Sequence, residues 1–370
     1  MTPRMRAHVA HLATVSHGSI SDTELADLGV SREEIIDFSV NSNPLGPSPF
    51  ALEAARESVW SHYPDDQATK LRRALAKHNE VDQSAVVVGN GSSELTCLIA
   101  LAFLDPGDAA VIVGPTFGEY ARATRIVGGI VHEYRAVASD GFAVNLSTVF
   151  DLVHAVEARL VFLCNPNNPT GTLLAADDVE QLARAVPETL VVVDEAYRPF
   201  VDDPPLTTPL LERGNVVLLR SLTKDYALAG LRLGYALAPR DVCMALDRVR
   251  PPWSVNAVAQ AAGLAAIGDG GHLERARAEV RHARVYLTTA FGKLGFPVLP
   301  STTNFLLVDV GTAAVMRRCL LQHGMCVRDC TSFGLPAYIR IGMRPVAECR
   351  RLTAAFAAIQ SGGLAETGPE

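Results

Sequence analysis

The sequence lacks a surplus of basic residues and lacks any apolar run long enough to cross a membrane. Its 33 lysine and arginine residues are outnumbered by 40 aspartate and glutamate residues, for a formal charge of −7. Proteins that bind nucleic acid or an anionic membrane carry basic patches, and this chain has no basic run or stripe. The first residues, Met1 to His8, contain no apolar core of a secretory signal. We therefore expect a cytoplasmic protein that binds neither nucleic acid nor membrane.

The sequence also lacks clustered metal ligands and regularly spaced cysteines. Seven cysteines are scattered along the chain, and the closest pair, Cys326 and Cys330, does not have CxxC spacing. The ten histidines include no HExxH pattern. We expect free thiols in a reducing compartment and no metal.

Lysine itself is scarce. The chain has four lysines, and Lys70, Lys77 and Lys293 lie in polar surroundings where a solvated ammonium is the natural interpretation. Lys224 instead follows an apolar run, 215–219, and lies among hydroxyl side chains. An amine held there can lose its proton at neutral pH and attack a carbonyl carbon. Pairing with Asp225 or helix capping is the alternative when this segment is considered alone.

Apolar runs alternate with helical patterns through the first three quarters of the chain. Five of them predict buried strands: 85–88, 109–113, 160–164, 190–193 and 215–219. Such alternation indicates an α/β fold with a large, mostly parallel sheet covered on both faces. Ligands bind at the carboxyl ends of such strands, where this chain places polar and aromatic residues.

Two of these strand ends carry distinctive groups. A glycine-rich turn, 89–94, precedes a helix and can hold a phosphate with its backbone N–H groups, although serine at a helix start is common. Asp194 directly follows four apolar residues, where a carboxylate needs a cationic partner.

The pattern of apolar runs and helical segments changes beyond residue 270. A long helix is predicted over 275–294, followed by short strands and two helices, which indicates a smaller α+β domain. Arg328 and Arg340 each lie in an apolar strand, a position that suits arginine when it binds an anion. A surface salt bridge with Asp329 is the alternative for Arg328.

A reactive lysine, a buried carboxylate and a phosphate-binding turn together suit pyridoxal phosphate. The chain resembles the fold-type I, aspartate-aminotransferase-like pyridoxal-phosphate enzymes over nearly its full length. Among them it is most similar to threonine-phosphate decarboxylase of cobalamin synthesis and to histidinol-phosphate aminotransferase. The matching motifs are Asp37-Phe-Ser-Val-Asn-Ser-Asn-Pro-Leu-Gly46, Tyr63-Pro-Asp65, Asn167-Asn-Pro-Thr-Gly171, Asp194-Glu-Ala-Tyr197, Ser221-Leu-Thr-Lys224 and Gly230-Leu-Arg-Leu-Gly-Tyr235.

The resemblance implies a role for each matching residue at the cofactor. Lys224 would form a Schiff base with the cofactor and later shuttle protons, and Asp194 would pair with the pyridinium nitrogen. Tyr197 and Asn168 would bond the phenolic oxygen of the ring, and Phe117 would stack on its face. The cofactor phosphate would be held by Ser92, Ser93, Ser221, Thr223 and Arg232.

The resemblance also implies a homodimer, in which Tyr63 reaches the cofactor phosphate of the neighbouring subunit. Arg340 would bind the substrate carboxylate and Arg328 a substrate phosphate, with His17 and Asn43 as further substrate contacts. The expected division is an N-terminal arm with part of the small domain (1–45), a large cofactor domain (46–275), a small domain (276–362) and a disordered tail (363–370).

Two reactions fit this resemblance. His17-Gly18, Arg220-Ser-Leu-Thr-Lys224 and Pro252-Trp-Ser-Val-Asn-Ala257 favour a decarboxylase of O-phosphothreonine, our first expectation. The alternative is an aminotransferase of the histidinol-phosphate type that uses 2-oxoglutarate, which Asp194-Glu-Ala-Tyr197 and the segment 43–49 also fit. A non-catalytic, ligand-sensing relative is disfavoured, because such regulators add a DNA-binding module and basic character.

Overall fold

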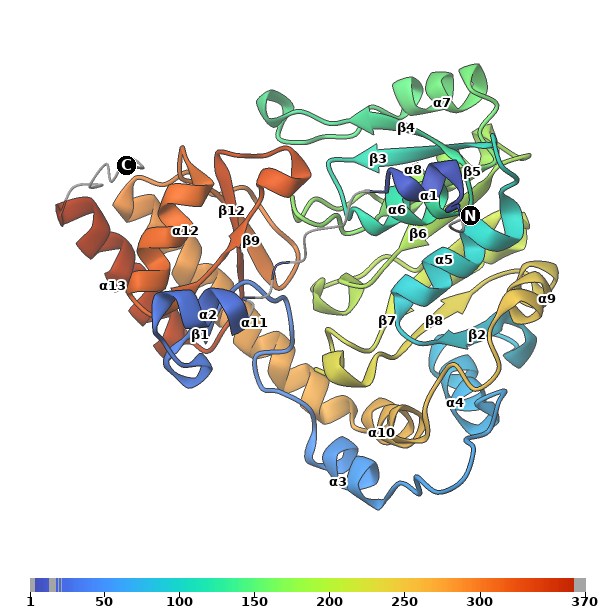
Figure 1. The fold of residues 1–370 in the computed structure, drawn as a ribbon, viewed down its shortest axis with the longest axis horizontal. Coiled ribbons are helices and arrows are strands. Elements are labelled where there is room, and N and C mark those ends of the chain that lie inside the picture. The colour runs from blue at the N-terminus through green and yellow to red at the C-terminus, as the bar shows by residue number, and fades with distance from the viewer. Residues whose placement is uncertain (1–3, 13–17, 19, 21, 363–370) are drawn as a thin grey trace.

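The computed structural model describes residues 4–12, 18, 20 and 22–362, which form a large and a small body (Figure 1). The large body contains a seven-stranded sheet in the order β2-β8-β7-β6-β5-β3-β4. Its strands are β2 (Val86–Gly89), β3 (Ala109–Gly114), β4 (Ile130–Arg135), β5 (Leu160–Cys164), β6 (Leu190–Asp194), β7 (Val216–Ser221) and β8 (Gly234–Leu237). The expected α/β fold with a large, mostly parallel sheet is confirmed.

The strands from β3 to β7 run in the same direction. The pairs β4–β3, β3–β5, β5–β6 and β6–β7 are parallel, whereas β8 is antiparallel to both of its neighbours, β7 and β2. Parallel neighbours place their carboxyl ends at one edge of the sheet. The polar residues that follow these strands therefore meet at that edge.

Helices cover both faces of this sheet, as the continuous apolar strands require. One face packs against α4 (Thr69–Asn79), α7 (Leu146–Ala155), α8 (Ala176–Ala185) and α10 (Ala257–Gly268). The other face packs against α5 (Ser92–Phe103), α6 (Glu119–Ile126) and α9 (Arg240–Val249). Every residue of β3, β5, β6 and β7 is buried.

The edge strand β4 was not predicted from the sequence. Its residues, Ile-Val-His-Glu-Tyr-Arg, are half-buried or exposed at one edge of the sheet. A mixed polar segment of this kind lacks the apolar run that marks the central strands.

The small body has its own core around a three-stranded antiparallel sheet of β11 (Arg328–Asp329), β12 (Tyr338–Gly342) and β9 (Phe305–Asp309). The helix α11 (Gly270–Leu294) runs from the large body into it (Figure 1), and α12 (Ala313–Gln322) and α13 (Val346–Gly362) complete it. The expected domain boundary at residue 275 lies within α11.

The N-terminal part of the chain joins both bodies. The strand β1 (Ile36–Asp37) pairs in parallel with β10 (Met325–Cys326), whereas β11, which follows β10 closely in the chain, belongs to the three-stranded sheet. The helix α1 (Ala7–Ala10) contacts α6 of the large body. The remaining N-terminal helices are α2 (Asp22–Leu28) and α3 (Pro49–Glu57). The expected disorder of residues 363–370 lies outside the described residues.

Candidate active site

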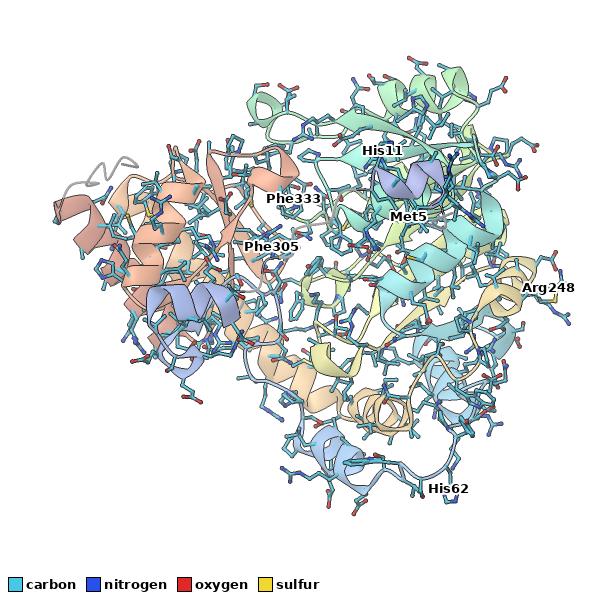
Figure 2. All side chains as sticks on the ribbon, in the orientation of Figure 1. Met5, His11, His62, Arg248, Phe305 and Phe333 are labelled. Atoms are coloured by element: carbon cyan, nitrogen blue, oxygen red, sulfur yellow. The ribbon has the colours of Figure 1, made fainter. Side chains whose placement is uncertain are left out.

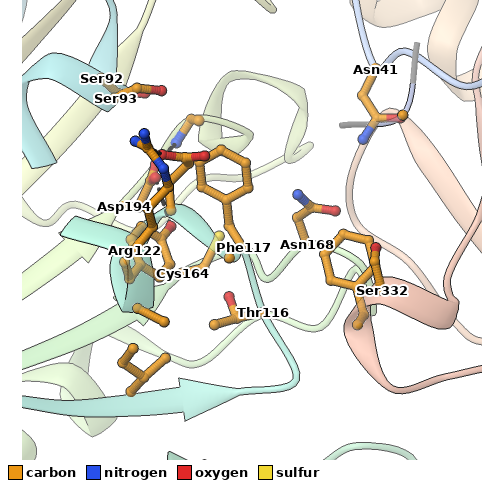
Figure 3. Close-up of a pocket in the computed structure, with 18 of the residues that line it drawn as sticks. Asn41, Ser92, Ser93, Thr116, Phe117, Arg122, Cys164, Asn168, Asp194 and Ser332 are labelled. Carbon is orange, nitrogen blue, oxygen red and sulfur yellow. Dashed lines mark hydrogen bonds and ion pairs between the residues drawn. The ribbon is translucent and has the colours of Figure 1, made fainter. Parts of the chain in front are cut away.

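The carboxyl ends of the central strands open onto a cavity of about 1130 Å³ that residues of both bodies line. Figure 3 shows part of it. Most side chains that the sequence analysis assigned to a cofactor or substrate line this cavity: Ser92, Ser93, Phe117, Asn168, Asp194, Tyr197, Ser221, Thr223, Lys224, Arg232, Arg328 and Arg340.

Lys224 lies in the turn that follows β7. Burial lowers the pKa of its ammonium to about 8, with repulsion from Arg340 and Arg232 acting in the same direction and Asp194 opposing them. A hydrogen bond fixes this turn: the backbone N–H of Asn43 donates to the backbone carbonyl of Lys224 (2.7 Å). Lys224 therefore presents an amine that is partly neutral near physiological pH.

Asp194 lies at the end of β6 and is 5% exposed. Its carboxylate accepts hydrogen bonds from the Tyr120 hydroxyl (2.7 Å) and the backbone N–H of Ala196 (3.0 Å). Burial nevertheless raises the pKa of Asp194, and these hydrogen bonds and Lys224 oppose that rise. A bound cation would reverse it. Sequence reasoning missed Tyr120, which is 74 residues away from Asp194 and stacks on Phe162.

Hydrogen-bond donors gather at the start of α5. The helix begins at Ser92 after Gly91, whose φ of +81° needs glycine and whose missing side chain leaves room for the Arg232 guanidinium. The hydroxyls of Ser221 and Thr223 lie 2.6 Å apart. Backbone N–H groups at a helix start, two hydroxyls and a guanidinium make a phosphate site.

The far side of the cavity carries an amide and phenol network. The Asn41 amide donates to the Tyr197 hydroxyl (3.3 Å), and Arg340 donates to the Asn168 side-chain oxygen (2.5 Å) and to the carbonyl of Ser39 (2.8 Å). Asn41 is a further residue that sequence reasoning missed. Among the described residues, the buried Nε of Arg340 has no hydrogen-bond partner, so a donor remains for a ligand.

Arg328 and Arg340 face each other across β11 and β12, where they are register partners. Arg328 donates to the Ser332 hydroxyl (2.7 Å) and lies over the Phe333 ring. The backbone of Gly18 passes so close that an added Cβ would lie 2.7 Å from Cδ of Arg328. His17, expected in this arm, lies outside the described residues.

Two expected site residues are not among the described residues that line the cavity. The Asn43 amide donates to the carbonyl of Asp225 and accepts from the N–H of Leu45, so it supports the Lys224 turn instead. Tyr63 is 78% exposed and stacks on Trp253, with ring centroids 4.5 Å apart.

The cavity is cationic although the protein is acidic. The described cationic residues that line it are Arg122, Arg125, Arg135, Lys224, Arg232, Arg328 and Arg340, and the acidic residues are Glu119, Glu133 and Asp194. Within the described part of the chain, His, Cys, Asp and Glu form no group of three that could hold a metal ion. The seven cysteines are free thiols.

These residues fit pyridoxal phosphate. The cofactor needs an amine for its aldehyde, a carboxylate for its ring nitrogen and donors for its phosphate. Lys224, Asp194 and the start of α5 provide these groups around one cavity, and Phe117 lines the same space.

Comparisons with known proteins identify the family. Residues 33–356 match the family model of aminotransferase class I and II. The histidinol-phosphate aminotransferase of Symbiobacterium thermophilum is 41% identical over 331 residues, which cover 88% of this chain and 90% of that protein. That of Anaeromyxobacter sp. is 39% identical over 96% of this chain and 99% of that protein.

Solved structures agree with these sequence relatives. The histidinol-phosphate aminotransferase of Sinorhizobium meliloti, solved in complex with pyridoxal-5'-phosphate, has a TM-score of 0.88 and 26% identity over 98% of this chain and 99% of that chain. The L-threonine-O-3-phosphate decarboxylase of Porphyromonas gingivalis has a TM-score of 0.79 and 30% identity over 88% of this chain and 100% of that chain.

The comparisons support the aminotransferase alternative better than the decarboxylase that we expected first, because the Symbiobacterium and Anaeromyxobacter relatives are both aminotransferases. Among the described residues, no helix is long and apolar enough to cross a membrane. The match over residues 33–356 shows that the chain is an enzyme of the aminotransferase class I and II family.

Proposed function

We propose that this enzyme is a pyridoxal-phosphate-dependent aminotransferase that takes the amino group from a phosphorylated amine of the histidinol-phosphate type and passes it to 2-oxoglutarate. The names of its relatives support this substrate class. The structural observation that carries the proposal is the pair of buried arginines, Arg328 and Arg340, which line the same cavity as the reactive lysine.

Two guanidinium groups in register across neighbouring strands repel each other. Arg328 is 8% and Arg340 7% exposed, and burial together with Arg340 lowers the pKa of Arg328. A bound anion relieves both the burial and the repulsion. Both substrates of the proposed reaction carry an anionic group that can bind these two arginines. One substrate has a phosphate, and the other has two carboxylates. The cationic lining of the cavity suits them equally.

Three groups of residues in the cavity would hold the cofactor. When bound, pyridoxal phosphate supplies an electrophilic aldehyde and a ring that withdraws electrons from the substrate Cα. Ser92, Ser93 and Arg232 would bind its phosphate, and Asp194 would supply the negative charge that its ring nitrogen needs. Tyr120 holds that carboxylate in place through a 2.7 Å hydrogen bond.

Proton transfer at the substrate Cα falls to Lys224. Its amine has a pKa of about 8, so Nζ can both accept and return a proton near neutral pH. Tyr197 and Asn168 would orient the cofactor ring through hydrogen bonds, and Arg340 would fix the substrate through its anionic group.

The test is turnover by purified enzyme with L-histidinol phosphate and 2-oxoglutarate. We expect glutamate to form only when both substrates are present. Release of carbon dioxide from O-phosphothreonine without a keto acid would show a decarboxylase instead. Lys224→Ala should abolish turnover and the reducible cofactor linkage, whereas Lys293→Ala, which removes an exposed lysine, should change neither.

We also propose a homodimer with shared active sites in the cytoplasm. Tyr63 is 78% exposed and lies outside the cavity of its own chain, and Trp60 (78%), Phe50 (62%) and Val59 (59%), in the segment that leads to it, are also exposed. Several large exposed apolar side chains in one segment suit a protein contact. Seven free thiols accord with a reducing compartment.

A further inference from the structure

The edge strand β4 holds a turn of the small body at the mouth of the cavity. The Arg135 guanidinium donates to Glu133 on the same strand (2.9 Å) and to the backbone carbonyl of Phe333 (2.5 Å). Phe333 ends the short 3-10 turn Thr331–Phe333, which lies 198 residues further along the chain. Phe333 lies on the side of the small body that faces the large body (Figure 2).

The turn leaves room for this guanidinium. Gly334 has a φ of +72°, and a Cβ added there would lie within van der Waals overlap of Nη2 of Arg135. Glycine suits this position both because it adopts this backbone conformation and because it leaves room for Arg135.

A second contact lies beside the first. Phe142, in the loop that follows β4, is 2% exposed although its φ is +60°, a conformation that is rare for a bulky residue. Its ring meets the edge of Tyr338 (centroids 6.0 Å apart) and packs in a cluster with Cys330 and Leu335 of the small body. A strained backbone persists where the surrounding contacts fix it.

The turn that Arg135 holds also holds Arg328. The Ser332 hydroxyl accepts a hydrogen bond from Arg328 (2.7 Å), and the Arg328 guanidinium lies 5.3 Å from the centre of the Phe333 ring. Arg135, Glu133, Arg328 and the turn all line the one cavity.

We propose that Arg135 is a positioning residue for substrate recognition: by fixing the 331–334 turn to the large body, it sets Arg328 at the distance from Lys224 that the phosphate end of the substrate requires. The inference rests on the proposed role of Arg328 as an anion-binding residue. Through Arg135, the strand β4 would help to determine which length of substrate fits between Arg328 and Lys224.

The effect on kinetics follows from where the interaction acts. Arg135 does not touch the reacting atoms, so its loss weakens substrate binding more than the chemical step. In Arg135→Ala we expect the KM for L-histidinol phosphate to rise roughly five- to tenfold while kcat changes less than about twofold. Gly334→Ala, which displaces the intact guanidinium, should change KM in the same direction.

The matched control is Arg284→Ala. Arg284 also joins a carboxylate, Asp202 (2.7 Å), and a backbone carbonyl, that of Thr303 (3.2 Å), but it is not among the described residues that line the cavity. This variant should leave KM and kcat unchanged.

Hydrogen exchange of the holoenzyme gives a readout that does not depend on turnover. The amides of Phe333, Gly334 and Leu335 donate to carbonyls of the same turn. In Arg135→Ala their exchange should accelerate roughly tenfold or more, with no change in Arg284→Ala. Unchanged exchange together with unchanged KM in Arg135→Ala would overturn the inference. An unchanged KM in Arg328→Ala would refute the proposed role of Arg328, and with it the positioning role of Arg135.

Discussion

At the scale of single residues, the burial that makes the Lys224 amine reactive also destabilises the folded state. The pKa of this amine falls from 10.5 to about 8, chiefly through burial. Below pH 8 the ammonium is buried in the folded state and solvated in the unfolded state. Between about pH 8 and 10.5 the unfolded state binds more protons, so stability rises with pH across this window.

We therefore predict that Lys224→Met stabilises the cofactor-free protein at pH 7 by roughly 1–3 kcal/mol. The difference should shrink as the pH rises above 8, because the wild-type amine then loses its charge. Urea unfolding at pH 7 and pH 9.5 measures both values. A difference that stays constant between pH 7 and pH 9.5 in Lys224→Met would contradict the lowered pKa of Lys224.

Some residues of the candidate site could be identified from the sequence, and others could not. Lys224 and Asp194 were identifiable because a charged group directly after an apolar run is unusual. Tyr120 and Asn41 were not, because their partners, Asp194 and Tyr197, lie 74 and 156 residues away and no local pattern marks the pairs. Asn43 was assigned to the substrate because it lies in a motif, but its amide bonds backbone.

At the scale of elements, the start of α5 depends on how closely β8 approaches it. A Cβ at Gly234 would lie 2.6 Å from the backbone N of Ser92 and 2.9 Å from the carbonyl carbon of Gly91. Both atoms belong to backbone, so the turn itself must move. The phosphate site that this turn forms would move with it.

We predict that Gly234→Ala lowers the affinity for pyridoxal phosphate at least tenfold, or about 1.4 kcal/mol, while Lys224 and Asp194 remain in place. Fluorescence titration of the cofactor-free protein gives the affinity. Gly230→Ala is the control, since an added Cβ there meets no atom within 4 Å. Equal affinities in the two variants would show that the turn tolerates the displacement.

A buried ion pair ties β6 to β7 immediately beside the site. Arg220 donates to Glu195 (2.7 Å), and the two side chains are 11% and 2% exposed. Thr207 contacts both, donating to Glu195 (2.7 Å) and accepting from Arg220 (3.2 Å). Glu195 directly follows Asp194, and Arg220 directly precedes the Ser221 turn that carries Lys224. The pair therefore aligns the two loops that carry the carboxylate and the amine.

We predict that Glu195→Ala destabilises the fold by about 3–5 kcal/mol, because Arg220 is left buried without its counter-charge. The comparison is Glu274→Ala, which breaks the exposed pair with Arg277 (Glu274 is 64% exposed) and should change the free energy of unfolding by less than about 1 kcal/mol. Urea unfolding of both variants decides the matter. Similar losses of unfolding free energy in the two variants would show that the buried pair of Arg220 and Glu195 stabilises the fold no more than the exposed pair does.

Sequence predicted the central strands and the edge strand β2, at 85–88, but missed the other edge strand, β4. The run 160–164 coincides with β5, and the run 109–113 lies within β3, because strands buried on both faces consist almost wholly of apolar residues. The half-exposed β4 has no such pattern, and it carries Arg135. Side chains at the mouth of the cavity were therefore the hardest part of the site to predict.

At the scale of the whole molecule, charge is unevenly distributed. The chain carries a formal charge of −7, yet cationic side chains outnumber acidic ones around the cavity. A cationic cleft with apolar walls concentrates the field and attracts anionic substrates. Under the proposed function, this field and the contacts of Arg328 and Arg340 together would select phosphorylated substrates.

The proposed dimer predicts that Tyr63 of one chain acts in the active site of its partner. Tyr63 lies outside its own cavity, so in a shared site its hydroxyl serves the partner's cofactor phosphate. Tyr63→Phe keeps the ring that stacks on Trp253 and removes only this hydroxyl, which should weaken cofactor binding roughly tenfold. Lys224→Ala retains Tyr63 and has no reactive amine.

Co-expression of these two variants should restore native sites, because a mixed dimer joins the Lys224 of one chain to the Tyr63 of the other. With random pairing, about half of the dimers are mixed and roughly a quarter of all sites are native. At limiting cofactor, activity should then exceed that of the Tyr63→Phe enzyme diluted to the same content of Lys224. If Tyr63 serves its own chain, the mixture contains no native site and matches the diluted variant, which would contradict the shared active site.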